Sequence, residues 1–477
     1  MDIKKLSIKK MFTGTSANQL AFFNILGPII LNGVNFFTVP IFTRLLGAEN
    51  YGVISLYTTW AQVLTIIMGI QTCGSIAAAR VHIDPKEHDA YYSSVLSLSC
   101  LVSSVLTVLI LVFINPISEF LQFNKIIVLL IIAQSFGAYI ISFATMKYIH
   151  HKQASLNFLV SVVVTLISIA LSLLLIMNID KFEDRYWGRI IGYAVPNVVV
   201  GLILGILIFA KGKTGFSKKY WSFCIPLSLP LIFHNLSQIL LAQSDRVMLQ
   251  KLMDDTAAVG IYSFIFNFVH IINIIYSALN NTWVPLYYDH LKLNDMEAVQ
   301  KRSKNYIVLY TILTMGFMLL APEVVKIFAS EEFWSGTELI PIMTVAYYMV
   351  FLYSFPVNFE FYHKKTRIIA VGTCLAAIVN IIANYYMIPI WGIKGASLAT
   401  MFSYIMLFIF HHIIAKFFVK GQKYHYKLIT FVPSMIAVAL ACAAFYAFID
   451  YWYIRWAIGA ALGVYMLLRL YKQKSIF

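Results

Sequence analysis

Charged residues are scarce in this sequence. Asp, Glu, Lys and Arg make up only 12% of its 477 residues, whereas hydrophobic residues make up 60%. A soluble domain of this length could not cover its surface with so few charges. The composition therefore excludes a soluble globular protein and predicts a chain that lies largely within a membrane.

Long polar segments are also lacking. The longest polar connection, residues 287–304, is far too short to hold a soluble catalytic domain. The sequence contains no G-x-S-x-G, Walker A or HExxH string. Glu360 is essentially the only acidic residue inside a hydrophobic segment, so the paired carboxylates of acid–base catalysis are missing. We therefore expect that this chain is not an enzyme and does not hydrolyse ATP.

The cysteines give no sign of a disulfide framework or a metal site, because none of them forms a C-x-x-C pair. They lie in or at the ends of hydrophobic segments, as Cys73, Cys100, Cys224, Cys374 and Cys442. We expect small buried apolar side chains at these positions. No metal and no other cofactor is expected.

What the sequence has instead is a series of long apolar runs. Each holds roughly 20 apolar residues, the length that a helix needs to cross a hydrocarbon core ~30 Å thick. They predict fourteen spans, at residues 18–43, 53–79, 91–114, 126–147, 156–178, 188–210, 222–243, 258–283, 305–329, 337–359, 367–388, 393–415, 428–449 and 452–471. The fold class is thus an all-α polytopic membrane protein.

Lys and Arg fall unevenly on the connections between these spans. The odd-numbered connections hold the minority, namely Arg44, Lys125, Lys181, Arg185, Arg189, Arg246, Lys251, Lys326, Lys394 and Arg455. The termini and the even-numbered connections hold the rest of the 36. Basic residues are retained on the cytoplasmic side during insertion, so both termini are predicted to be cytoplasmic. The net charge of +15 then mostly measures loops that face anionic lipid headgroups, and no nucleic acid is expected as a partner.

A weak internal repeat divides the chain. Residues 51–57 (YGVISLY) open the second span and residues 259–265 (VGIYSFI) open the eighth, each after a polar link. An offset of six helices gives both halves the same orientation, so a pseudo-two-fold axis would run along the membrane normal. We predict a six-helix lobe at residues 1–211, a second six-helix lobe at 212–419, and an additional helix pair at 420–477. Two lobes around a central cavity fit alternating access.

Polar residues inside spans locate the interior of the protein, since a polar side chain in hydrocarbon must face protein or water. Two interpretations stay open for them, a hydrated cavity between the lobes and hydrogen bonds that join helices. The residues expected to line a cavity are Asn32, Asn35, His234, Gln238, Asn267, His270 and Asn273. For His234 and His270, proton relay stands against an ordinary hydrogen-bonding role.

Charges near the span ends form a second group of candidates. Asp245 and Arg246 end the seventh span, close enough to form a local pair at the outer rim. Arg44 follows the first span and Arg80 closes the second. A guanidinium grips phosphate bidentately, so the arginines suit a pyrophosphate-bearing ligand. Asp245 and Glu360 are candidates for ion coupling.

The stretch at residues 32–52 (NGVNFFTVPIFTRLLGAENYG) resembles the start of the Wzx-type polysaccharide, or O-antigen, repeat-unit flippases. Residues 243–249 (QSDRVML), followed by residues 259–263 (VGIYS), resemble the opening of that family's second lobe. The family belongs to the multidrug/oligosaccharidyl-lipid/polysaccharide (MOP) exporter superfamily.

The resemblance implies fourteen helices and a substrate of the undecaprenyl-diphosphate-linked oligosaccharide type. It would be flipped from the cytoplasmic to the outer leaflet of the bacterial inner membrane, for O-antigen, capsule or exopolysaccharide synthesis. In that family cationic cavity residues serve the pyrophosphate, a role that maps onto Arg44, Arg246 and Arg80. Coupling to a proton or sodium gradient is a family expectation. The implied partners are membrane lipids, a polysaccharide polymerase and a chain-length regulator.

Three alternatives to this function stay open. A multidrug antiporter of the same superfamily would need only twelve helices and usually carries an embedded carboxylate in its first helices. A lipid II flippase shares the fourteen helices. From a different class, a membrane-embedded glycan polymerase or glycosyltransferase would be expected to carry a large periplasmic loop with catalytic residues. Fold alone does not decide between them.

Overall fold

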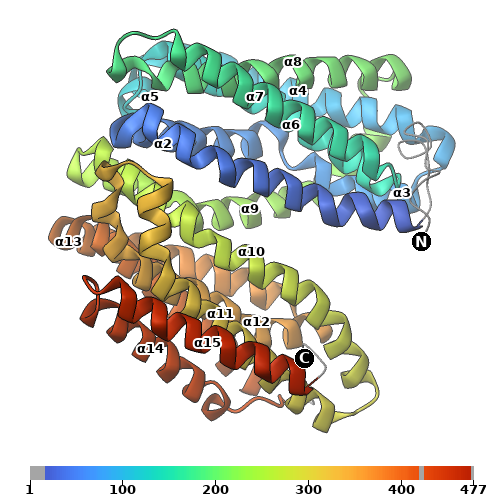
Figure 1. Cartoon of the computed structure of the whole chain (residues 1–477). Coiled ribbons are helices and arrows are strands. Elements are labelled where there is room, and N and C mark those ends of the chain that lie inside the picture. The colour runs from blue at the N-terminus through green and yellow to red at the C-terminus, as the bar shows by residue number, and fades with distance from the viewer. Residues whose placement is uncertain (1–16, 418–423, 474–477) are drawn as a thin grey trace, which may run out of the picture. The chain divides into compact units, whose positions relative to one another are not determined.

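The computed structural model describes residues 17–417 and 424–473, with the side chains of 17–32, 35, 36 and 473 left out. Within these ranges every regular element is a helix, as the sequence predicted (Figure 1). The chain divides into two compact units. Unit 1 comprises residues 1–46 and 53–239, and unit 2 comprises residues 47–52 and 240–477.

Two long helices are shared between the units, because the division falls inside each of them. They are α2 (Ala17–Gly69) and α9 (Lys218–Met253). The other α-helices of unit 1 are α3 (Ile76–His82), α4 (His88–Val112), α5 (Ile114–Leu121), α6 (Lys125–His150), α7 (Ala154–Met177) and α8 (Tyr186–Gly212). Short 3-10 helices η2 (Thr72–Ser75), η3 (Pro85–Glu87) and η4 (Phe182–Asp184) connect them.

Unit 2 holds the remaining helices. They are α10 (Thr256–Lys292), α11 (Met296–Phe328), α12 (Ile340–Tyr362), α13 (Thr366–Phe417), α14 (Val432–Ala447) and α15 (Trp452–Gln473), with the 3-10 helices η5 (Glu331–Leu339) and η6 (Leu428–Thr430). The terminal helices α14 and α15 both pack against α11. The lobe boundaries predicted at residues 211 and 419, the pseudo-axis and the cytoplasmic termini stay predictions.

Eleven of the described helices are long and apolar enough to cross a membrane. The predicted count of fourteen is larger for identifiable reasons. Both α2 and α13 hold two predicted spans, joined at Gly47 (φ 67°) and Gly392 (φ 55°). A glycine adopts such positive φ values without the steric penalty of a Cβ, so the chain reverses there without a longer loop. The predicted thirteenth span is α14, which has only 16 residues.

Close backbone packing and hydroxyl groups hold unit 1 together. A Cβ at Gly201 of α8 would lie 2.6 Å from the carbonyl oxygen of Gly137 in α6, so these two helices approach at a glycine contact. The buried phenol of Tyr139 is hydrogen-bonded to Thr72 at 2.5 Å and to Ser99 at 2.6 Å. Helices in lipid associate through small residues and interhelical hydrogen bonds of this kind, because lipid tails are as apolar as leucine.

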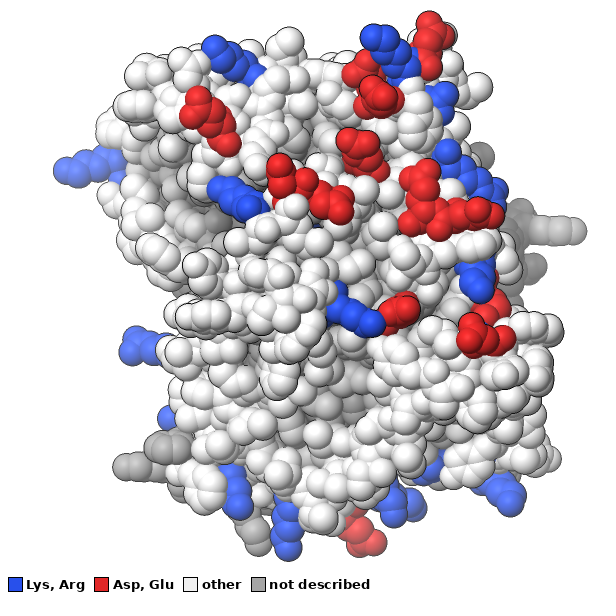
Figure 2. Space-filling view, turned by 90° about the vertical axis from the view of Figure 1, so that its left-hand side faces the viewer, with Lys and Arg blue, Asp and Glu red and all other residues white. Residues whose placement is uncertain are grey.

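Aromatic side chains form the core of unit 2. The ring centroids of Tyr310 in α11 and Phe351 in α12 lie 4.2 Å apart, and those of Trp283 in α10 and Tyr306 in α11 lie 5.5 Å apart. Outward, the helices expose large apolar side chains such as Ile206 and Leu467. Figure 2 looks onto the left-hand ends of the helices of Figure 1, where acidic and basic side chains lie among uncharged residues.

Candidate functional site

Two oppositely charged residues that are adjacent in the sequence are buried near the end of α9. Asp245 is 1% exposed and Arg246 is 3% exposed, and both belong to unit 2. Removing a carboxylate and a guanidinium from water costs several kcal/mol each unless other groups replace the lost hydration. The surroundings of the two side chains therefore decide what they do.

The Asp245 carboxylate is held by three donors from two other helices. The phenol of Tyr262 in α10 and the hydroxyl of Thr400 in α13 both donate to Oδ2, the latter at 2.6 Å. The amide of Asn384 in α13 donates to Oδ1. The carboxylate thus ties α9, α10 and α13 together, and each of its oxygens accepts at least one hydrogen bond.

A second layer of polar groups surrounds this carboxylate. The Asn384 amide also donates to Oδ1 of Asn380 at 3.0 Å, and the hydroxyl of Ser244 donates to the same oxygen at 3.0 Å. Asn380 in turn donates to Thr400 at 3.4 Å. One group in the network has no partner among the described residues, the buried Oδ1 of Asn384. A buried carbonyl oxygen without a hydrogen bond costs folding free energy. A cation or donor that binds this oxygen would recover that free energy.

Arg246 turns to a different set of partners. Its Nε donates to the hydroxyl of Ser263 at 2.9 Å, and its Nη2 donates to Oδ1 of Asn267 at 3.3 Å, both in α10. The guanidinium also lies 4.8 Å from the centroid of the Phe266 ring. A flat cation that stacks on a ring and donates to neutral oxygens keeps its charge uncompensated by direct contact.

The predicted local pair between Asp245 and Arg246 at the outer rim is wrong. Consecutive residues on a helix point about 100° apart, so their side chains diverge into different neighbours. No ion pair joins them in the described part of the chain, and both side chains are buried among other partners.

The second predicted coupling residue, Glu360, lies in a separate buried pair. Near the end of α12, its carboxylate lies 2.8 Å from Nδ1 of His411 in α13, and both side chains are fully buried. The Tyr353 ring lies 5.7 Å from the imidazole. The other ring nitrogen, Nε2, has no partner among the described residues. The histidine was not predicted as a partner, because the sequence presents it only as one of two adjacent histidines.

The other predicted residues divide between the two units. His270 and Asn273 of α10 are half-buried and hydrogen-bonded to each other at 3.2 Å, one turn beyond Asn267. His234 is half-buried and Gln238 is exposed in the unit 1 part of α9. Arg44 in α2 and Arg80 in α3 are exposed. The side chains of Asn32 and Asn35 lie outside the described residues.

A buried arginine in unit 1 was not singled out from the sequence. Arg189 of α8 donates to Ser172 at 3.1 Å and to Tyr193 at 2.7 Å, and its guanidinium lies 3.7 Å from the ring centroid of Phe42. It belongs to the minority of basic residues on odd-numbered connections. Membership of that minority could have pointed to Arg189, since Arg246 belongs to it as well.

No group of three or more His, Cys, Asp or Glu in the described ranges is arranged to hold a metal ion. The Asp245 carboxylate lies among hydroxyl and amide groups instead. Such a set suits a proton or a hard monovalent cation better than a transition metal.

Known protein sequences are similar to much of this chain. The model of a family described as polysaccharide biosynthesis protein matches residues 19–289. A Haemophilus influenzae protein, the Lsg locus putative protein 1, is 22% identical over 376 residues, which cover 75% of this chain and 88% of the relative. An uncharacterized membrane protein of the same organism is 22% identical over 370 residues, covering 74% and 86%.

Solved structures of transporters share the fold. The lipid II flippase MurJ in an inward closed conformation aligns with a TM-score of 0.70 at 15% identity, covering 93% of this chain and 99% of MurJ. An inward-facing multidrug resistance MATE family transporter of the MOP superfamily aligns with a TM-score of 0.60 at 14% identity, covering 90% and 97%. These likenesses show a transporter fold and do not transfer a substrate.

Proposed function

We propose that this chain, which belongs to the polysaccharide biosynthesis protein family, flips a lipid-linked oligosaccharide across the membrane by alternating access. The family model and the shared fold support a multi-pass inner-membrane transporter, not an enzyme. The likeness to MurJ and to a MATE transporter supports the predicted MOP superfamily.

The buried charges at Asp245 and Arg246 carry the proposal. A transporter fold needs no buried charge for stability, since apolar side chains of similar volume are usually at least as stabilising. Ionisable residues retained inside membrane proteins mark substrate or ion pathways. Here the carboxylate of α9 is hydrogen-bonded to α10 and α13, so a change in its charge would alter the contacts among these three helices.

The proposed substrate is an undecaprenyl-diphosphate-linked repeat unit, carried from the cytoplasmic to the outer leaflet for surface polysaccharide synthesis. A diphosphate needs cations, and the exposed Arg44 is the candidate that lies in the most family-like stretch of the sequence. Arg246 and Arg80 are further candidates. A polymerase and a chain-length regulator as partners stay predictions.

The proposed coupling ion is a proton or Na⁺ at Asp245. The carboxylate, the hydroxyls of Tyr262 and Thr400 and the unpartnered Oδ1 of Asn384 are the oxygen types that such a cation takes. The chemistry of the residues therefore fits a hard monovalent cation. Glu360 with His411 is a second candidate for proton uptake.

The direct test measures flipping in spheroplasts or proteoliposomes with a labelled lipid-linked oligosaccharide. We expect deletion cells to accumulate the lipid-linked glycan on the cytoplasmic side. Arg44→Ala should slow flipping at least about 10-fold, the effect of losing roughly 1.4 kcal/mol of diphosphate binding. Undiminished transport would remove Arg44 from that role, and deletion cells without accumulation would refute the flippase itself.

The same cells separate the alternatives. A multidrug antiporter would change drug resistance on deletion and leave the lipid-linked glycan unchanged. A lipid II flippase would block cell-wall synthesis when depleted. Proton and sodium coupling are separated by imposing each gradient alone on proteoliposomes.

A further inference from the structure

Unit 1 contains a cavity of about 330 Å³. Its walls come from η3, α4, α6, α8 and the start of α7, so every lining residue belongs to unit 1. These helix ends are the predicted cytoplasmic ends of unit 1, where the basic residues gather. None of the residues proposed above for transport lines the cavity.

One end of the cavity is cationic. Lys147 of α6 points into it, with its side chain only 13% exposed, and its Nζ lies 4.8 Å from the ring centroid of Tyr92. The same Nζ lies 2.8 Å from the Asp89 carboxylate, which is itself 52% exposed. Lys211, at the end of α8, adds a second and exposed ammonium group. With one carboxylate against two ammonium groups, the charge at this end remains positive.

Two histidines also line the cavity beside the lysines. The rings of His88 and His151 lie 5.5 Å apart between centroids, nearly perpendicular to each other. His151 shares a hydrogen bond of 2.7 Å with the phenol of Tyr92, which fixes one ring nitrogen. When the ring is protonated, both nitrogens are donors, so Nδ1 can then donate to an anion. The lysines of α6 and α8 and the imidazolium that follows α6 are donors that phosphate groups select.

The other walls of the cavity are apolar. Leu156 of α7 and Leu204 and Leu207 of α8 line it. Leu207 is 50% exposed, on the same helix as the outward-facing Ile203 and Ile206. The apolar walls therefore run out onto helix surface that faces lipid, whereas the cationic end lies at the predicted headgroup level.

We propose that this cavity binds the phosphate of an anionic phospholipid from the surrounding membrane, with its glycerol and acyl chains along the leucine wall. Basic pockets between transmembrane helices on the cytoplasmic side select lipids of this charge. The size of the cavity favours a phospholipid over the transported substrate, because 330 Å³ lies at the lower end for ligand sites. A single phosphate fits such a volume better than a diphosphate with several sugars.

The test uses the full-length protein, purified and placed in nanodiscs with a mixture of phosphatidylglycerol and phosphatidylcholine. Lipid that stays bound is counted by native mass spectrometry. We expect phosphatidylglycerol to be retained over phosphatidylcholine. Substituting both lysines, Lys147→Gln with Lys211→Gln, should lower that retention at least about 10-fold.

Two further variants keep the result interpretable. Lys219→Gln is the matched control, because Lys219 also lies in unit 1 near the same helix ends, but is exposed, pairs with Glu87 and does not line the cavity. It should retain phosphatidylglycerol like the wild type. Leu207→Trp narrows the cavity without altering charge and should reduce retention while the protein remains monodisperse.

Three outcomes would overturn the proposal. The first is equal retention of the two lipids. The second is protection of the protein against heat by inorganic phosphate alone to the same extent as by phosphatidylglycerol, which would make this a site for free phosphate. The third is displacement of phospholipid by the lipid-linked oligosaccharide, with loss of flipping in Leu207→Trp, which would make it a substrate site.

Discussion

Gly52 of the first repeated segment and Gly260 of the second pack backbone against backbone in unit 2. A Cβ added at Gly52 would lie 2.0 Å from the carbonyl oxygen of Thr256, and one added at Gly260 would lie 1.9 Å from that of Ala48. The two similar segments thus contact each other through the glycines that occupy equivalent positions in them. This contact explains why residues 47–52 group with unit 2 although they lie in the middle of α2.

The first prediction concerns that contact. Gly260→Ala should destabilise the protein by about 1–3 kcal/mol, because the added methyl group forces α2 and α10 apart. Gly316→Ala is the control, since Gly316 lies in the helix α11 with nothing within 4 Å of its Cβ position. There alanine should be neutral or stabilise by up to about 1 kcal/mol through helix propensity. Thermal unfolding in detergent compares the two, and equal stability of both variants would contradict the close contact.

Most of the fold could be predicted from the sequence, because hydrophobic length decides it in a membrane. Each predicted span overlaps a described helix. What apolar length does not reveal is the conformation of a link, so the positive φ angles at Gly47 and Gly392 were not predicted. The repeat at residues 51–57 and 259–265 was visible, but that the two glycines touch depends on tertiary packing.

Only the charged residues of the candidate site could be predicted from the sequence. Asp245, Arg246 and Glu360 stood out because charge is rare in apolar segments. The partner Thr400 did not, since hydroxyl residues are common in membrane helices and this one lies 155 positions from Asp245. His411 was missed for the same reason, as a partner from another helix. The predicted rim pair failed because adjacency in sequence places side chains on different sides of a helix.

The second prediction tests the Asp245 network. Thr400→Val keeps the shape of the side chain and removes the hydroxyl that donates to the carboxylate at 2.6 Å. The loss of one charge-assisted hydrogen bond is worth about 1.5–3 kcal/mol. We expect the concentration of coupling ion for half-maximal flipping to change at least about 10-fold.

Thr373→Val is the matched control for this substitution. Thr373 is also buried in α13, but its hydroxyl donates to the carbonyl of Ile369 in its own helix at 3.0 Å. This variant should leave the ion dependence unchanged. Identical ion dependence of the two variants would exclude a role for Thr400 in coupling.

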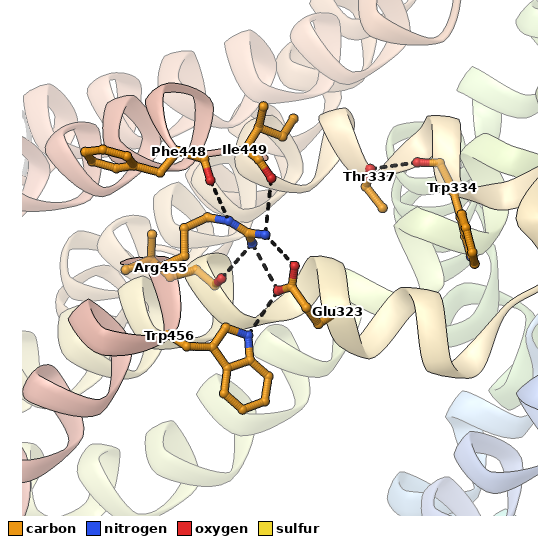
Figure 3. Close-up of polar contacts among 8 residues, drawn as sticks. Glu323, Trp334, Thr337, Phe448, Ile449, Arg455 and Trp456 are labelled. Atoms are coloured by element: carbon orange, nitrogen blue, oxygen red, sulfur yellow. Dashed lines mark hydrogen bonds and ion pairs between the residues drawn. The ribbon is translucent and has the colours of Figure 1, made fainter. Parts of the chain in front are cut away.

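The third prediction concerns the attachment of the terminal helices. Arg455 at the start of α15 is 1% exposed and forms an ion pair with Glu323 of α11 (Figure 3). It also donates to the carbonyls of Phe448 at 3.0 Å and Leu319 at 3.0 Å. Trp456 donates to the same carboxylate at 3.1 Å. The guanidinium therefore joins the link between α14 and α15 to α11.

Breaking this ion pair should lower the free energy of unfolding. Arg455→Met removes the cation, so the Glu323 carboxylate keeps only the indole of Trp456 among these donors and the carbonyls of Phe448 and Leu319 lose the guanidinium. The uncompensated carboxylate should destabilise the protein by about 3–5 kcal/mol. The control is Lys394→Met, which breaks a pair with Glu338 in which both side chains are 50% exposed, so at most about 1 kcal/mol should be lost. Limited proteolysis should cut near α14 in the first variant alone. Equal stability of the two variants would show that Arg455 does not anchor α15.

The fourth prediction links the proposed phospholipid cavity to pH. His151 lies in the short link after α6. Partial burial, followed by the positive charges of His88, Lys147 and Arg80, lowers the pKa of His151, and only Asp89 opposes them. The imidazole is therefore neutral at neutral pH, and its protonation is unfavourable in the protein alone. The other groups that face it are the phenol of Tyr92 and, across the cavity, Lys211.

A bound phosphate reverses that preference. Its negative charge favours the imidazolium and raises the pKa of His151 in the complex, so affinity for an anionic lipid must increase as pH falls through that pKa. Retention of phosphatidylglycerol should therefore rise between about pH 8 and pH 5.5, the range in which histidine titrates. His151→Gln should flatten this dependence while retaining the binding due to Lys147 and Lys211. His82→Gln, an exposed histidine of α3 outside the cavity, should keep the full slope. A pH slope that survives in His151→Gln would show that another group titrates, and His88 is the other imidazole that lines the cavity.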